Sequence, residues 1–279
     1  MISKLAQRLL VFFIGVPVVI ALVCLRQQHH LALHLALMAA SVCAALELHA
    51  IFSHSFRLQH KAFIALLALV VPLSAFLCAF FSLPLAYIDY TFIGAVLLSL
   101  AAEVITAQSF EHSNARLMAS TFIILYSGYL PTFISKMTVR EHSVALIAVF
   151  LLMVFMCDSI AWLFGNLFGK SNRGIIKASP NKSVAGFIGG FVGAAASGLA
   201  GRAVWANVFT GSPAKVVALG LLIAFCAITG DLVESVFKRS ANCKDSGSIV
   251  PGRGGVLDSV DSIFFAAPVY YLTSTLFFF

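Results

Sequence analysis

The chain contains a succession of long apolar runs, and these runs constrain its fold more than any other feature. A transmembrane helix needs about 20 apolar residues, because the hydrocarbon core of a bilayer is about 30 Å thick. We therefore predict an all-α integral membrane protein with about nine transmembrane helices. The runs cover residues 9–25, 31–52, 62–81, 85–105, 117–134, 144–164, 184–204, 214–233 and 260–278.

Composition supports this interpretation. The chain is 61% hydrophobic and only 10% charged, with a mean hydropathy of +1.00, whereas about 25% of the residues of a soluble domain are charged. Lys4 and Arg8 precede the first run, as in a signal peptide, but no small-x-small cleavage site follows it. We therefore interpret the first run as a retained span. The six cysteines show no paired spacing, so neither disulfides nor a cysteine-bound metal is expected.

The distribution of lysine and arginine predicts the orientation of the chain. Nine spans place the two termini on opposite sides, and thirteen of the 18 cations then fall on the side of the N-terminus. The other side receives five, namely Arg26, Lys136, Arg140, Arg202 and Lys215. The positive-inside rule therefore predicts a cytoplasmic N-terminus and a C-terminus outside, in the cell inner (plasma) membrane.

Most acidic residues of the spans fall at one level in this topology. The cytoplasmic ends of the spans carry Glu47, Glu103, Asp158, Asp231, Asp258 and Asp261, and only Asp89 falls near the opposite face. An ionisable group within a span costs free energy unless it is paired or binds a metal, so each is a functional hypothesis. The alternative is a set of paired structural acids.

Two long loops on the cytoplasmic side, residues 165–183 and 234–259, carry eight of the thirteen cations of this face. Cations alone favour attraction to anionic lipid head groups, and no nucleic acid is expected as a partner. Carboxylates beneath the cations suggest more specific chemistry. Carboxylates bind divalent metals, metals and cations bind phosphates, and glycines let backbone N–H groups approach those phosphates.

The second loop resembles the C-terminal signature of the phosphatidate cytidylyltransferases, also called CDP-diacylglycerol synthases. The matching positions are Ser235, Lys238, Arg239, Lys244, Asp245, the PGRGG stretch of residues 251–255, Asp258 and Asp261. Upstream, GDLVES, DSIAWLFGNLFGK and SPNKSVAG are similar to further stretches of the family, and the number of spans also fits. The resemblance covers about the last 120 residues closely.

Four positions depart from the family pattern. Arg253 stands where the family usually has His, Ser259 replaces Arg, Asn181 replaces Lys and Ala185 replaces Glu. Arg253 keeps a cation, and a guanidinium can contact phosphate oxygens bidentately. The role of a glutamate at position 185 is either absent or supplied elsewhere, for example by Glu103 or Glu234.

The resemblance implies a CTP:phosphatidate cytidylyltransferase, which makes CDP-diacylglycerol and pyrophosphate from CTP and phosphatidic acid for phospholipid biosynthesis. It implies one polytopic membrane domain over residues 1–279, with N-terminal helices to about residue 140 and the catalytic helices and loops from about residue 141. Mg²⁺ is the expected cofactor. A second, monovalent cation and a homodimer are left open.

Roles for individual residues follow from the resemblance together with the chemistry of phosphoryl transfer, which is mainly positioning and charge neutralisation. Asp231 and Asp258 are the expected metal carboxylates, with Asp261 as a third ligand or a support. Asp158 supports the site, and Ser179 and Lys182 form a flap over the nucleotide. The phosphates would be held by Lys238, Arg239, Lys244 and Arg253, with close backbone approach at Gly252, Gly254 and Gly255. The predicted catalytic residues are Asp231, Asp258, Lys244 and Arg253.

Two alternatives remain at this stage. One is a CTP-dependent transferase that acts on another lipid phosphate. The other is an ion-coupled transporter, because intramembrane acids and a glycine-interrupted helix also mark transport pathways. The acids crowd one face instead of the midplane, which favours the enzyme. The glycine-rich span, GFIGGFVGAAASGLAG, is explained by close helix packing or by dimerisation.

Overall fold

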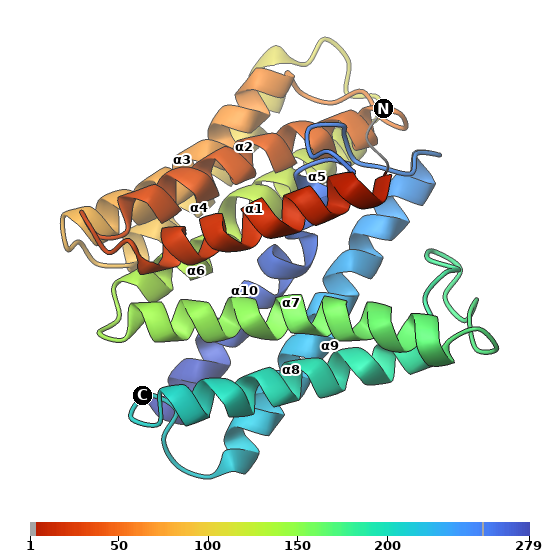
Figure 1. Cartoon of the computed structure of the whole chain (residues 1–279). Coiled ribbons are helices and arrows are strands. Elements are labelled where there is room, and N and C mark those ends of the chain that lie inside the picture. Colours follow the sequence, from red (N-terminus) through yellow and green to blue (C-terminus); the bar gives the residue numbers. More distant parts are fainter. Residues whose placement is uncertain (1–3, 253) are drawn as a thin grey trace. The chain divides into compact units, whose positions relative to one another are not determined.

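The computed structural model describes residues 4–252 and 254–279, with side chains from residue 13 onward. Every regular element of this part is a helix (Figure 1). The elements are α1 (Lys4–Cys24), α2 (Leu31–Ser53), α3 (Lys61–Phe80), α4 (Ala86–Thr106), α5 (Ser113–Ile123), the π-helix η1 (Ile124–Tyr129), α6 (Thr132–Thr138), α7 (Ser143–Phe168), α8 (Val184–Val204), α9 (Pro213–Ser240) and α10 (Leu257–Phe278).

Among the described residues, eight helical segments are long and apolar enough to cross a membrane. One of them is Ser113–Thr138, in which α5, η1 and α6 follow one another. Helix α1, which is 21 residues long, precedes these eight segments and brings the number in the described chain to nine. The prediction of an all-α integral membrane protein with about nine helices is therefore confirmed, while the direction of the termini stays a prediction.

Several helix ends differ from the predicted runs by a few residues, and two of these differences bear on the site. The predicted run ends at Val233, directly before Glu234, yet α9 continues to Ser240. Helix α10 begins at Leu257, three residues before the predicted start. The segment 234–240 contains neither glycine nor proline, so nothing in it interrupts the helical hydrogen bonds. The connection between α9 and α10 is thus residues 241–256, the α9–α10 loop.

The chain forms two compact units. Unit 1 comprises the described residues of Met1–Val139 and Phe237–Val260, and unit 2 comprises Arg140–Val236 and Asp261–Phe279. In unit 1, α2 packs on α3, and α3 packs on α4 and η1. Gly128 of η1 lies against the backbone of α3, because an added Cβ would meet the Ala68 carbonyl oxygen at 2.8 Å. The hydroxyl of Ser41 donates to the carbonyl of Ser127 and links α2 to the same place.

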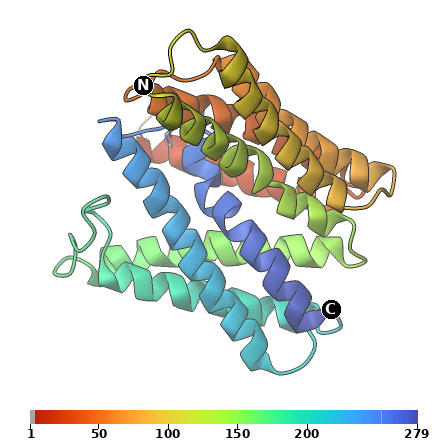
Figure 2. The ribbon, with the colours of Figure 1, turned by 180° about the vertical axis from the view of Figure 1, so that it is seen from behind.

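In unit 2, α7 and α8 run side by side along their lengths (Figures 1 and 2). Glycines of α8 make this close approach possible. A Cβ at Gly189 would lie 2.8 Å from the carbonyl oxygen of Ile160, and Gly190 and Gly193 face α7 in the same way. The glycine-rich span therefore serves close helix packing, one of the two explanations that the sequence offered.

Candidate active site

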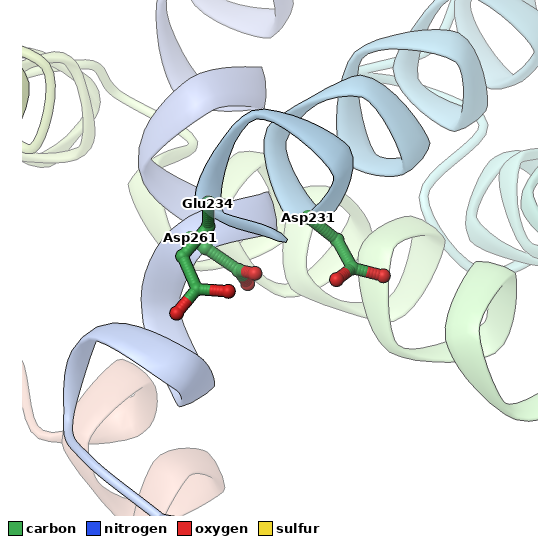
Figure 3. Close-up of side chains that lie close together, drawn as sticks. All are labelled: Asp231, Glu234 and Asp261. Carbon is green, nitrogen blue, oxygen red and sulfur yellow. The ribbon is translucent and has the colours of Figure 1, made fainter. Parts of the chain in front are cut away.

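Three carboxylates gather in unit 2. Asp231 and Glu234 lie three residues apart on α9, a spacing that places both on one helix face, and Asp261 lies on α10. One oxygen of each lies within 4.8 Å of the others, and Figure 3 shows the three side chains beside the two helices that carry them. Glu234 is 1% exposed and Asp261 6% exposed. The cluster is therefore a set of three neighbouring carboxyl groups, two of which are buried.

Close packing of α9 and α10 brings these carboxylates together. Gly230 directly precedes Asp231, and a Cβ there would lie 2.9 Å from the carbonyl oxygen of Asp261 and 2.7 Å from Phe265 Cβ. The Ser262 hydroxyl donates to the carbonyl of Ala227 at 3.0 Å. The glycine of GDLVES thus lets the two helices meet at the level of the cluster.

Lys182 forms an ion pair with Asp231. The geometry before α8 positions this lysine. The Lys182 backbone N–H donates to the carbonyl of Ser179 at 3.1 Å, which makes a turn of the SPNKS stretch. The next residue, Ser183, is the N-cap of α8, and its hydroxyl accepts from the N–H of Gly186 at 3.1 Å. Ser179 and Lys182 are therefore brought together, and Lys182 reaches the cluster.

Asp158 also belongs to unit 2, on an exposed position of α7. Its neighbour Cys157 is fully buried against α8, where a Cβ on Gly190 would lie 3.0 Å from the Cys157 sulfur. The supporting role of the Asp158 side chain stays a prediction.

Asp258 lies in the first turn of α10, within unit 1, where its carboxylate is surrounded by donors. Lys238 Nζ donates to Oδ1 at 2.5 Å, and the backbone N–H groups of Ser246 and Gly255 donate to Oδ2 at 2.9 and 2.7 Å. The Ser246 hydroxyl lies 2.9 Å from the same oxygen. Asp258 and Lys238, both predicted from the signature, are thus brought together, and they hold the α9–α10 loop in shape.

The remaining predicted residues lie along this loop or beside it. Arg239 and Lys244 are exposed, and Arg239 donates to the carbonyl of Cys243 at 3.4 Å. Gly252 and Gly254 have φ angles of 74° and 118°, in the left-handed region that favours glycine. Val250 and Gly254 exchange two backbone hydrogen bonds, at 2.8 and 3.0 Å, which closes a tight turn. Arg253 lies outside the described residues.

The acidic cluster of unit 2 contains two of the three predicted metal ligands, Asp231 and Asp261, and the role of Asp258 as a metal ligand stays a prediction. Asp231 and Asp261 belong to the cluster of unit 2 and Asp258 to unit 1, while Glu234 joins the cluster without having been assigned as a ligand. The three-residue spacing from Asp231 was the available signal for Glu234. A second residue without an assigned role is Glu47 of α2, whose carboxylate accepts hydrogen bonds from the α9–α10 loop. Only its position inside a span could have suggested it.

The fold and these sites define an integral membrane protein with a buried carboxylate cluster and a structured cationic loop. A model of the cytidylyltransferase family matches residues 6–277. The chain therefore belongs to the cytidylyltransferase family.

Named relatives are similar to the chain over much of its length. Phosphatidate cytidylyltransferase 5, chloroplastic, of Arabidopsis thaliana is 30% identical over 68% of this chain and 53% of its own. The phosphatidate cytidylyltransferase of Thermotoga maritima is 31% identical over 69% of this chain and 70% of its own. That of Helicobacter pylori is 35% identical over 60% and 58%. The chain thus spans about half the length of the Arabidopsis relative.

Proposed function

We propose that this protein transfers CMP from CTP to phosphatidic acid and releases CDP-diacylglycerol and pyrophosphate. The observation that carries the proposal is the cluster of Asp231, Glu234 and Asp261, joined by Lys182, in a member of the cytidylyltransferase family. Relatives that bear the name phosphatidate cytidylyltransferase support the choice of lipid substrate. The orientation predicted from the lysines and arginines places the reaction on the cytoplasmic face of the inner membrane.

Mg²⁺ fits the donor set of the cluster. Magnesium prefers oxygen ligands, and its usual protein ligands are one or two carboxylates together with waters and substrate phosphates. The three carboxylates lie within 4.8 Å of one another, and Lys182 supplies a single positive charge beside them. A divalent ion would balance the remaining charge. Asp231, Glu234 and Asp261 would hold it, and it would neutralise the charge of the triphosphate.

The chain's own residues bind and orient the two substrates. An oxygen of the lipid phosphate is itself a nucleophile, so the reaction needs no serine or cysteine activated by a base. That oxygen attacks the α-phosphorus of CTP, the bond from this phosphorus to the β-phosphate oxygen breaks, and pyrophosphate leaves. Lys182 is placed to meet phosphate oxygens beside the cluster. Lys238, Arg239, Lys244 and Arg253 stay predicted phosphate contacts of the signature loop.

Incubation of the purified protein with labelled CTP, magnesium and phosphatidic acid tests the proposal. We expect labelled CDP-diacylglycerol and one equivalent of pyrophosphate. Parallel reactions with a polyprenyl phosphate distinguish a transferase for another lipid phosphate. Product from the polyprenyl phosphate alone would change the substrate, and no product from any lipid phosphate would refute the activity.

A further inference from the structure

Glu47 of α2 has a buried carboxylate that accepts hydrogen bonds from the start of α10. Its side chain is in unit 1, and the residue is 6% exposed. Oε1 accepts from the N–H of Val256 at 2.9 Å, and Oε2 accepts from the N–H of Leu257 at 2.7 Å. These N–H groups belong to a helix N-terminus, where backbone donors lack partners within the helix and negative charge is favourable. Glu47 therefore caps a helix that lies about 210 residues further along the chain.

The same carboxylate reaches Asp258 through one serine. The Ser246 hydroxyl lies 2.8 Å from Glu47 Oε2 and 2.9 Å from Asp258 Oδ2. Because a hydroxyl has a single proton, this serine shares it between two carboxylates. Asp258 Oδ1 in turn accepts a hydrogen bond from Lys238 Nζ at 2.5 Å. A continuous series of contacts thus runs from α2 to the signature residues of unit 1.

Two glycines of the α9–α10 loop give room to the Glu47 carboxylate. A Cβ at Gly247 would lie 2.7 Å from Glu47 Oε1, and a Cβ at Gly255 would overlap Glu47 Oε2 and the Ser246 hydroxyl. Gly255 was predicted to let backbone approach a phosphate. The contacts give it a further reason to be glycine, because the loop wraps closely around Glu47.

From these contacts we propose that Glu47 is a positioning residue for cytidylyl transfer. It fixes the α9–α10 loop and the carboxylate of Asp258, and it does not touch the substrates. The role in catalysis rests on the proposed function, whereas the anchoring of the loop does not. The sequence signature lies entirely in the C-terminal part of the chain, so this role would give the N-terminal helices a part in organising it.

Replacement of Glu47 by Gln tests the role, because the amide keeps the shape and loses the charge and one acceptor oxygen. Loss of a supporting contact around a catalytic group typically lowers activity by about 10- to 100-fold. We expect a fall of this size in kcat/KM for CTP, with a raised KM for CTP. The matched control is Asp89→Asn, which removes the carboxylate that holds Tyr129 and Lys136 in the same unit. The control should keep kcat/KM within about threefold, since its partners lie outside the loop.

A double-mutant cycle separates the positioning role of Glu47 from a general loss of stability. Gly247→Ala should lower kcat/KM in the parent protein, because its Cβ meets Glu47. In a Glu47→Ala background it should add little, because the atoms that it would meet are gone. Fully multiplicative effects of the two substitutions would overturn the proposed contact.

The rate of trypsin cleavage after Lys244 measures how firmly the α9–α10 loop is held, and it does not depend on the transfer reaction. Cleavage should be faster in Glu47→Gln than in the parent and in Asp89→Asn. If the parent makes no CDP-diacylglycerol, the proposed function fails and cleavage alone decides whether Glu47 anchors the loop. Unchanged cleavage would overturn the anchoring, and unchanged kcat/KM in an active parent would overturn the catalytic role.

Discussion

At the scale of single residues, Lys182 and Asp231 set the charge of the candidate site. Their ion pair is partly exposed, with 24% of the Lys182 side chain and 36% of the Asp231 side chain accessible. Both groups therefore stay reachable by a substrate or an ion. The buried members of the cluster, Glu234 and Asp261, have carboxyl oxygens within 4.8 Å of an oxygen of Asp231.

Lys182→Ala should change the apparent affinities for magnesium and for CTP in opposite directions. Removal of the ammonium leaves the cluster more negative, so the magnesium concentration for half-maximal rate should fall. The KM for CTP should rise by about 10- to 100-fold, because a charged phosphate contact is worth about 1.5–3 kcal/mol. Lys182→Arg should recover part of the CTP affinity. Initial rates at varied magnesium and CTP measure both effects, and a higher magnesium requirement in Lys182→Ala would contradict the assignment.

At the scale of elements, the contact between α9 and α10 determines whether the cluster forms. Gly230 provides that contact, because its added Cβ would lie 2.7–2.9 Å from atoms of α10. Glycine is otherwise unfavourable within a helix, by about 1 kcal/mol relative to alanine. The close approach of the two helices explains why glycine stands there.

Gly230→Ala should destabilise the protein by about 1–3 kcal/mol, the usual cost of overpacking, and should lower transfer activity together with stability. Gly94→Ala is the matched control in α4, since an added Cβ there meets nothing within 4 Å. That control should be neutral or slightly stabilising. Thermal unfolding in detergent, followed with the activity of each variant, measures both. Equal unfolding temperatures for the two variants would refute the close contact.

Most of the helices and part of the candidate site could be predicted from the sequence. The features that the sequence did not predict were missed for physical reasons. Apolar runs gave the helices, because span length reflects bilayer thickness. They missed the end of α9 at Ser240, since hydropathy does not report helical hydrogen bonding. The spacing of the signature motifs predicted Asp231 and Asp261 as carboxylates of the site. Glu47 could not be assigned a partner, because its contacts lie about 200 residues away in the chain and depend on packing.

At the scale of the whole molecule, the orientation in the membrane decides which substrates reach the site. Thirteen cations on the predicted cytoplasmic side include Lys182, Lys238, Arg239 and Lys244. CTP is a charged, water-soluble nucleotide and does not cross a bilayer, so the loops that would bind it must face the compartment that contains it. The two cationic loops are therefore expected on one side.

Single cysteines at exposed positions test the orientation in a background without native cysteines. Ile175→Cys and Ser248→Cys lie in the two cationic loops, and Asn207→Cys lies between α8 and α9. A membrane-impermeant maleimide should label positions 175 and 248 only from the cytoplasmic side, and position 207 only from the other side. Labelling of 175 and 248 from opposite faces would contradict the predicted topology.

The magnesium dependence of CDP-diacylglycerol formation in carboxylate variants tests the central claim most directly. Asp231→Asn and Glu234→Gln keep the shape of each side chain and remove its charge. We expect each to lower the rate by about 100-fold or more, and the double variant to be little worse, because both residues would serve one ion. The exposed carboxylate variant Glu111→Gln is the control and should match the parent. A rate within a few-fold of the parent at ordinary magnesium in either variant would contradict the metal assignment.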